Sequence, residues 1–212
     1  MTRQIKNLGV AALAVVALAA AVASVASAAS YTASTYPTTV TAEGALGNST
    51  LTTEAGKVEC KTHYEGTLAA TSSSLTIKVK HTNCKAFGFL EATVNTGSCD
   101  YLYTQPTGGP NDQYVAPVDV KCTNAASPIT ASAGSCKFTI GEQSLTGQVS
   151  FTDNTAEGDV FAKGNLTGIK YTVTEDGFGC PFGGTGAKTG ASWVEHSSVT
   201  FDSTNGATFD IA

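Results

Sequence analysis

Strict alternation of apolar and polar side chains is the feature that most constrains this chain. Between Gly56 and Cys84, mostly apolar residues occupy every second position of two segments, and the positions between them carry Lys, Glu, His or Thr. A period of two places the two sets on opposite faces of a β-strand. The small polar residues 70–73 separate the segments. The pattern therefore predicts a long β-hairpin with a core face and a solvent face, on which Glu65 lies opposite Lys78.

The same alternation continues along most of the chain and predicts an all-β fold. No stretch after the N-terminal segment shows helical periodicity, and turns rich in Gly, Asn, Asp and Ser separate the apolar segments. We expect an antiparallel β-sandwich of Ig-like or Greek-key type as one domain over residues 38–212, with 29–37 as a flexible lead-in; the alternative is a β-barrel. The expected strands are 38–42, 49–53, the two hairpin arms, one strand between 87 and 94, 99–103, 116–122, 136–140, 145–151, 160–173 with a bulge at Gly168, 192–201 and 207–211.

The N-terminus resembles an export signal. Arg3 and Lys6 precede an apolar run over residues 8–25, and Ala26 to Ala28 form a small-residue cleavage sequence. This order is typical of a secretory signal peptide, which we assign to residues 1–28, and the alternative is a retained membrane anchor. We therefore expect a secreted or cell-surface protein, without membrane insertion after signal cleavage.

The charge of the chain disfavours polyanionic partners. The net charge is −5, and removal of Arg3 and Lys6 makes it −7 and leaves no arginine. Nucleic-acid binding depends on clustered Lys and Arg, so a nucleic-acid partner is excluded from the expectations. The same repulsion disfavours anionic membrane surfaces.

Six cysteines in an exported chain predict a disulfide framework. When the strands at 99–103 and 116–122 are paired, Tyr101 lies opposite Val120 and Cys99 lies opposite Cys122, so these two cysteines are expected to bond. A bond between Cys60 and Cys84 requires a bulge or a strand that ends at Cys84, because their strand phases differ by one residue. A bond between Cys136 and Cys180 follows only by elimination. The cysteines are Cys60, Cys84, Cys99, Cys122, Cys136 and Cys180.

The glycine-rich segment 177–190 is the first candidate site. Phe178, Pro181 and Phe182 offer apolar contacts on a backbone that a Cys180 disulfide would hold in place, so they form a candidate ligand loop. The alternative is a long irregular connection without a ligand.

The turn at residues 153–159 is a weak candidate for calcium. Asp153, Asn154, Glu157 and Asp159 supply the hard oxygen ligands that Ca²⁺ takes from flexible loops. The same residues are ordinary in hairpin turns, and their spacing does not fit an EF-hand. We therefore expect no metal and no cofactor.

No recognised catalytic motif is present in the sequence. There is no Gly-x-Ser-x-Gly elbow, and the phases of His63 and His81 point to opposite faces of the hairpin. Glu195, His196 and Ser197 are consecutive, but neighbours along a strand project to opposite sides. We therefore expect a protein that is not an enzyme.

The aromatic residues could form a platform for sugar rings. Trp193, Tyr101, Tyr103 and Tyr114 are the candidates. The strand phase places Tyr101 and Tyr103 on the inward face with Cys99, so core packing is the favoured interpretation.

Several segments resemble known exported proteins. The Ala-rich signal sequence, the segment Cys84–Phe89 and the segment 178–182 are similar to a group of exported all-β proteins of high-GC actinobacteria. The resemblance implies export. A looser resemblance is to the neocarzinostatin family of secreted, acidic, disulfide-bonded Ig-like apoproteins, which implies an Ig-like fold and an apolar small-molecule ligand.

Three classes of function remain. The first is a secreted, non-catalytic binding or cell-surface module whose partner is an extracellular protein or a glycan. The second is an extracellular carrier of a small apolar molecule. The third is a secreted enzyme or protease inhibitor.

Overall fold

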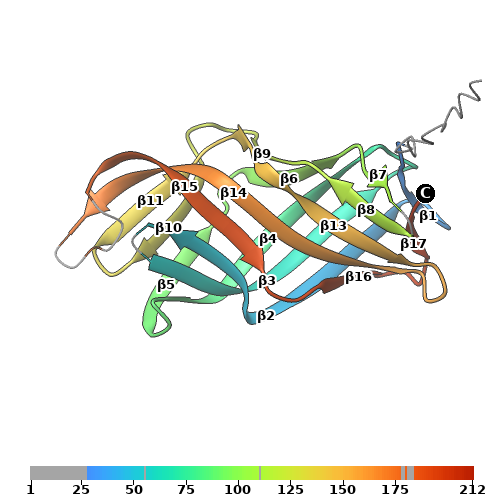
Figure 1. Ribbon diagram of the computed structural model, residues 1–212, viewed down its shortest axis with the longest axis horizontal. Coiled ribbons are helices and arrows are strands. Elements are labelled where there is room, and N and C mark those ends of the chain that lie inside the picture. Colours follow the sequence, from blue (N-terminus) through green and yellow to red (C-terminus); the bar gives the residue numbers. More distant parts are fainter. Residues whose placement is uncertain (1–27, 55, 110, 178–179, 181–183) are drawn as a thin grey trace, which may run out of the picture.

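The computed structural model describes residues 28–54, 56–109, 111–177, 180 and 184–212 (Figure 1). The expected signal peptide therefore lies, except for Ala28, outside the described residues. In the part of the chain that is described, no helix has the length and apolar character needed to cross a membrane.

The described chain consists of strands joined by turns, as the alternation predicts. All strand pairings are antiparallel, and β2 to β16 form one hydrogen-bonded sheet while β1 and β17 form a separate pair. The strands are β1 (Tyr31–Ala33), β2 (Thr38–Thr53), β3 (Gly56–Leu68), β4 (Ser74–Ala86), β5 (Leu90–Asn95), β6 (Cys99–Thr104), β7 (Thr107–Gly108), β8 (Gln113–Ala116), β9 (Val118–Cys122), β10 (Ile129–Ala133), β11 (Cys136–Ile140), β12 (Gln143–Ser144), β13 (Thr146–Asn154), β14 (Asp159–Asp176), β15 (Gly186–Glu195), β16 (Val199–Ser203) and β17 (Phe209–Ile211).

The sheet closes on itself as a barrel. Eight strands pair in the circuit β11, β10, β5, β4, β3, β2, β15, β14 and back to β11, and the closing pair places Phe138 opposite Val173 and Thr139 opposite Thr172. The barrel alternative is therefore confirmed, and the sandwich expectation is not. Long twisted strands curl the sheet until its edges meet, instead of stacking two separate sheets.

Four long strands, β2, β3, β4 and β14, continue beyond this circuit into the other half of the molecule (Figure 1). There they pair with shorter strands: β4 with β6, β6 with β9, β9 with β12, β13 with β14, and β16 with both β14 and β2. The Leu145 amide donates to the Val118 carbonyl at 2.9 Å and links β9 to the start of β13. A second circuit of pairings thus encloses the other end of the molecule.

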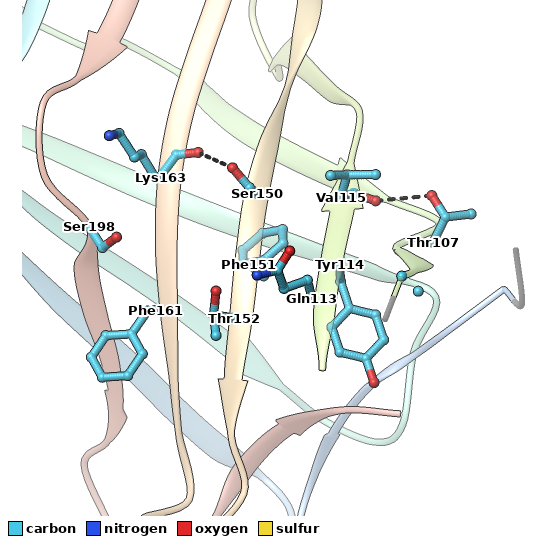
Figure 2. A pocket seen from close by; sticks show the side chains of 12 residues that line it. Thr107, Gln113, Tyr114, Val115, Ser150, Phe151, Thr152, Phe161, Lys163 and Ser198 are labelled. Atoms are coloured by element: carbon cyan, nitrogen blue, oxygen red, sulfur yellow. Dashed lines mark hydrogen bonds between the residues drawn. The ribbon is translucent and has the colours of Figure 1, made fainter. Parts of the chain in front are cut away.

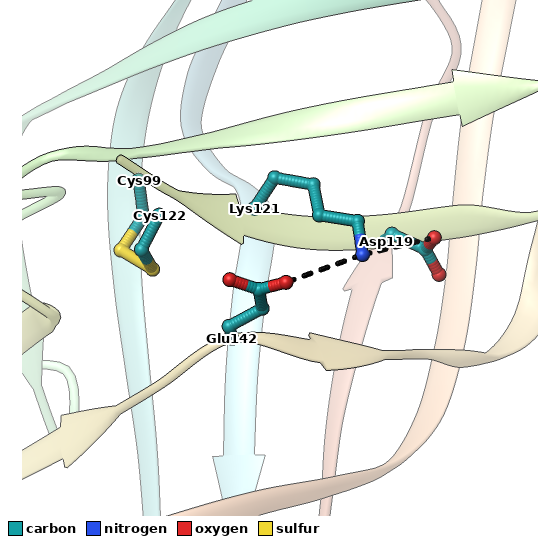
Figure 3. A network of polar contacts seen from close by, with 5 residues as sticks. All are labelled: Cys99, Asp119, Lys121, Cys122 and Glu142. Atoms are coloured by element: carbon teal, nitrogen blue, oxygen red, sulfur yellow. Dashed lines mark hydrogen bonds and ion pairs between the residues drawn. A yellow bond between two sulfur atoms is a disulfide. The ribbon is translucent and has the colours of Figure 1, made fainter. Parts of the chain in front are cut away.

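An exposed charge network lies where β9 meets β12 (Figure 3). The Lys121 ammonium lies 3.7 Å from an Asp119 carboxylate oxygen on the same strand and 3.3 Å from a Glu142 carboxylate oxygen just before β12. Exposed pairs of this kind contribute about 1 kcal/mol or less. The backbone pairing and the nearby Cys99–Cys122 disulfide therefore hold this junction.

The structure confirms the expected cysteine pairs. Cys99 lies directly opposite Cys122 in the β6–β9 register, and their sulfurs are 2.04 Å apart. Cys60 bonds to Cys84 across a register shift between Glu59 and Lys61, which is the bulge that the phase difference requires. Cys136 bonds to Cys180. Three disulfides indicate an oxidising, extracellular environment.

The structure joins two predicted strands and contains the bulge predicted at Gly168. Segments 38–42 and 49–53 belong to one strand, β2, because a register irregularity between Gly44 and Ser49 accommodates residues 45–48. In β14 the expected bulge is present: the register against β15 shifts on both sides of Ile169, and Gly168 has a φ of 67°. Such a backbone conformation favours glycine.

The expected flexible lead-in, residues 29–37, instead contains strand β1. Tyr31 is completely buried, and β1 pairs with β17 at the opposite end of the chain. Phe209 and Ile211 of β17 are also buried. Burial of these three side chains stabilises the pairing of β1 with β17. Because β1 is short and does not alternate, its sequence alone does not predict a strand.

The barrel interior is packed with the inward-facing side chains. Tyr101 and Tyr103 are buried there, as their phase predicts. An internal cavity of about 10 Å³ remains beside Leu51, Phe138 and Trp193. This is roughly the space that one water molecule needs.

We predict that removal of the Cys99–Cys122 bond weakens the fold without changing it. The double substitution Cys99→Ser with Cys122→Ser should lower the free energy of unfolding by about 2–4 kcal/mol, because the unfolded chain gains freedom. Urea unfolding followed by circular dichroism measures this loss. An unchanged unfolding midpoint would show that the bond contributes no stability.

Candidate ligand-binding groove

A groove of about 410 Å³ lies on the outer surface of the sheet and is the candidate site (Figure 2). It is formed by β7, β8, β13, β14 and the start of β16. Its volume falls within the range of roughly 300–1,000 Å³ that is typical of small-molecule sites. Its lining residues are Thr107, Gly108, Gly109, Gln113, Tyr114, Val115, Ser150, Phe151, Thr152, Phe161, Lys163 and Ser198.

Strand register arranges the side chains of this groove in rows. Thr152 of β13 pairs with Phe161 of β14 on one side and with Gln113 of β8 on the other. Directly paired residues project from the same face of a sheet, and neighbouring strands lie about 4.8 Å apart. An aromatic ring, a hydroxyl and an amide therefore line up across three strands, as Figure 2 shows.

A second, parallel row lies two residues further along the strands. Ser150 pairs with Lys163 and with Val115, and Val115 pairs with Thr107. The Ser150 hydroxyl donates to the Lys163 carbonyl at 3.3 Å, and the Thr107 hydroxyl donates to the Val115 carbonyl at 3.2 Å (Figure 2). These bonds fix the two hydroxyl groups against the backbone.

Several polar side chains in the groove have no protein partner. Within the described residues, the side chains of Gln113, Thr152 and Lys163 make no hydrogen bond or ion pair. The described lining residues include no carboxylate. The groove therefore offers free donors and acceptors beside an aromatic ring, with a single positive charge.

Tyr114 lies at one end of the groove and connects it to an acidic region. Burial raises the pKa of Tyr114, and the carboxylates of Asp153 and Asp112 raise it further. Of the proposed sugar platform, Tyr114 alone lines this groove, since Tyr101 and Tyr103 are buried and Trp193 packs against the core. The sequence did not identify Phe161 as a site residue, because its place in the alternation is the same as that of any outward-facing strand residue.

Glu195 is buried in the barrel interior and is not part of the groove. Its carboxylate accepts a hydrogen bond from the Tyr64 hydroxyl and one of 3.0 Å from the Gly164 amide. Burial raises the pKa of Glu195, and these two hydrogen bonds oppose the increase. The sequence presents Glu195 only as a neighbour of His196 and Ser197; the inward phase that Glu195 shares with Ala191 was the signal for its burial.

The histidines lie apart, as their phases predict. His63 faces outward, with Nδ1 2.6 Å from a Glu43 carboxylate oxygen, whereas His81 is buried. Burial lowers the pKa of His81 to about 4, and neither ring nitrogen has a hydrogen-bond partner in the described chain. The ring centroid of His81 lies 5.0 Å from that of Trp193. His196 contacts the Thr50 hydroxyl at 3.2 Å.

The candidate loop segment is described in part, and its last residues, from Gly186 on, belong to β15. Phe178, Pro181 and Phe182 lie outside the described residues, while Cys180 is bonded to Cys136 of β11. This bond attaches the β14–β15 connection to the end of the barrel.

The turn at residues 153–159 does not gather its oxygens around one point. The Asn154 amide donates to Glu157 at 3.0 Å, and Asp153 points instead toward the buried end of the barrel. Among the described residues, no group of three His, Cys, Asp or Glu side chains is placed to hold a metal ion. The geometry therefore gives the calcium candidate Asp153, Asn154, Glu157 and Asp159 no support.

Comparison with known proteins gives no relative: no family model, no curated protein and no solved structure matches the chain.

The carboxyl group of Asp153 makes the stability of this end of the barrel depend on pH. One of its carboxylate oxygens accepts a 3.4 Å hydrogen bond from the Ile211 amide of β17, and the other is buried without a partner in the described chain. Burial raises the pKa of Asp153 to about 6, and the charges of Asp210, Asp112 and Asp159 add to the increase. The folded protein thus favours the protonated form.

We predict that the substitution Asp153→Asn removes a pH-dependent loss of stability. In the unfolded chain this carboxyl titrates near 3.8, so the free energy of unfolding should fall as the pH rises from about 4 to about 6. The Asp153→Asn variant should lack this decrease in the free energy of unfolding, and it should therefore be more stable than the original protein at pH 7. Urea unfolding at several pH values measures it, and identical pH profiles for the two proteins would contradict the prediction.

Proposed function

We propose that the chain is a secreted, non-catalytic binding module that binds a neutral carbohydrate in the groove of β8, β13 and β14. The observation that carries the proposal is the row of Phe161, Thr152 and Gln113 across three strands. A sugar ring has an apolar C–H face that packs on an aromatic ring and hydroxyls around its edge. The sugar hydroxyls can pair with the free Thr152 hydroxyl and Gln113 amide of the groove, which both donate and accept hydrogen bonds.

The rigidity of the groove supports this proposal. Its lining side chains project from paired strands, and hydrogen bonds to the backbone hold Ser150 and Thr107. Sites on regular strands keep their geometry better than sites on loops, and a preformed site loses less entropy on binding.

The charge of the chain supports a neutral ligand. The mature chain would carry a net charge of −7, which repels polyanions at a distance. In the groove, Lys163 can donate hydrogen bonds to sugar hydroxyls without a carboxylate competing for it among the described lining residues.

The interior and the groove chemistry favour binding over the other two classes. A carrier of a small apolar molecule needs a cavity of roughly 300 Å³ or more, whereas the internal cavity measures about 10 Å³. Among the described lining residues there is neither a carboxylate pair nor a histidine. The groove is thus better suited to holding a ligand than to transforming it.

We predict that Phe161→Ala weakens carbohydrate binding by about tenfold, because losing the aromatic contact together with the apolar area it buries costs about 1.4 kcal/mol. Affinity electrophoresis through gels containing soluble cellulose derivatives, xylan, mannan or dextran measures the retardation of the purified protein. The matched control is Phe89→Ala, since Phe89 is a 79% exposed phenylalanine on the β4–β5 turn, remote from the groove.

Retardation by at least one of these polymers is expected, with loss in the Phe161 variant and none in the Phe89 variant. If no polymer retards the protein, or if both variants behave like the original chain, the proposed function is wrong.

A further inference from the structure

A second groove lies further along the outer face of β14. It measures about 640 Å³ and lies between the β11–β12 connection, β14 and β15. Lys170 and Thr172 of β14 line it together with Lys188 of β15. The first groove is lined by Phe161 and Lys163 of the same strand. One long strand therefore supplies the floor of both grooves.

The strip of β14 between the two grooves is polar and exposed. Asn165 and Thr167 continue the outward series that begins at Phe161. Figure 1 shows β14 as one uninterrupted strand that runs along the length of the molecule. Nothing apolar interrupts the path along its described outer face.

The bulge at Gly168 is what keeps both grooves on the outside. Before it the odd-numbered residues face outward, and after it Lys170 and Thr172 do so while Ile169 and Tyr171 are buried. Without the bulge, strict alternation would direct Lys170 into the barrel.

The second groove shares free lysine and threonine groups with the first, although its described lining includes Glu142 and its one aromatic residue, Tyr171, is buried. Gln143 makes two hydrogen bonds of 2.9 Å to the backbone of Lys170, which fix this part of the strand. Within the described residues, the ammonium groups of Lys170 and Lys188 have no ion-pair partner, whereas the lining residue Glu142 is paired with Lys121. Free donors and threonine hydroxyls again line the groove.

We infer that β14 is a track along which a single polysaccharide chain occupies both grooves at once. Seven residues separate Lys163 from Lys170, which at about 3.3 Å per residue corresponds to about 23 Å. A monosaccharide or disaccharide is too short to reach from one groove to the other, so the ligand is a polymer. This inference rests on the proposed function and deepens it by naming the form of the carbohydrate.

Occupation of both grooves predicts a dependence on ligand length. Once a chain is held in the first groove, its far end reaches the second at high effective concentration, which raises the affinity of long chains only. Isothermal titration with cello-, xylo-, manno- and malto-oligosaccharides, from disaccharide to octasaccharide, measures this dependence. In at least one series the affinity should rise with length until the chain spans both grooves and then level off.

Variants separate the two grooves. The double substitution Lys170→Ala with Lys188→Ala should lower the affinity for the longest oligosaccharide by about tenfold and leave that for short ones unchanged, whereas Phe161→Ala should weaken both. The matched control is Lys78→Ala with Lys80→Ala, which removes two exposed lysines from β4, outside both grooves. Thermal unfolding of each variant verifies that the fold is intact.

The outcomes distinguish the track from the function on which it rests. If affinity depends on Phe161 but not on ligand length, or if the Lys170 and Lys188 variant binds long chains normally, the track is wrong and the first groove remains a sugar site. If no oligosaccharide series binds, the proposed function fails and the track fails with it.

Discussion

The pairing of β11 with β14 is the constraint on which the rest of the structure depends. It places Phe138 opposite Val173 and joins the two ends of a sheet that would otherwise present unpaired strand edges. Closure leaves every inward side chain facing others across a narrow interior, and the packing there leaves a cavity of about 10 Å³. The consequence is functional as well as structural, because a cavity of that size holds about one water molecule and the two grooves lie on the outer face.

The disulfides and the buried polar groups secure this arrangement at different places. Cys60–Cys84 and Cys99–Cys122 each join neighbouring strands, while Cys136–Cys180 attaches the β14–β15 connection beside the closing pair, where Cys136 is opposite Asp176. Inside the barrel, the carboxylate of Glu195 is bound by the Tyr64 hydroxyl and the Gly164 amide and so joins three strands. A buried carboxylate is costly unless it is hydrogen-bonded, and these two donors offset that cost.

Alternation in the sequence predicted most of the strands, the Cys99–Cys122 register and the bulge at Gly168, because the faces of a strand follow directly from a period of two. It missed β10, a member of the closed circuit, and it predicted one strand over residues 192–201 where the structure has β15 and β16. It did not choose between sandwich and barrel, since both place one face of each strand inside and differ in which distant strands meet. The short strand β1 was missed because its burial depends on β17, at the other end of the chain. The groove was missed for a similar reason: Gln113, Thr152 and Phe161 come from three strands, and only register brings them together.

Closure of the sheet maintains both the interior and the grooves, since an open sheet would expose the interior and rearrange the outer face that forms the grooves. Amide hydrogen exchange measured by peptide-resolved mass spectrometry tests closure most directly. We predict that the amides of β11 and of the paired end of β14 are protected as strongly as those of β3, which has a partner strand on both sides. Rapid exchange of β11 together with that end of β14, at the rate of an unpaired edge, would show that the sheet is open and would contradict the barrel.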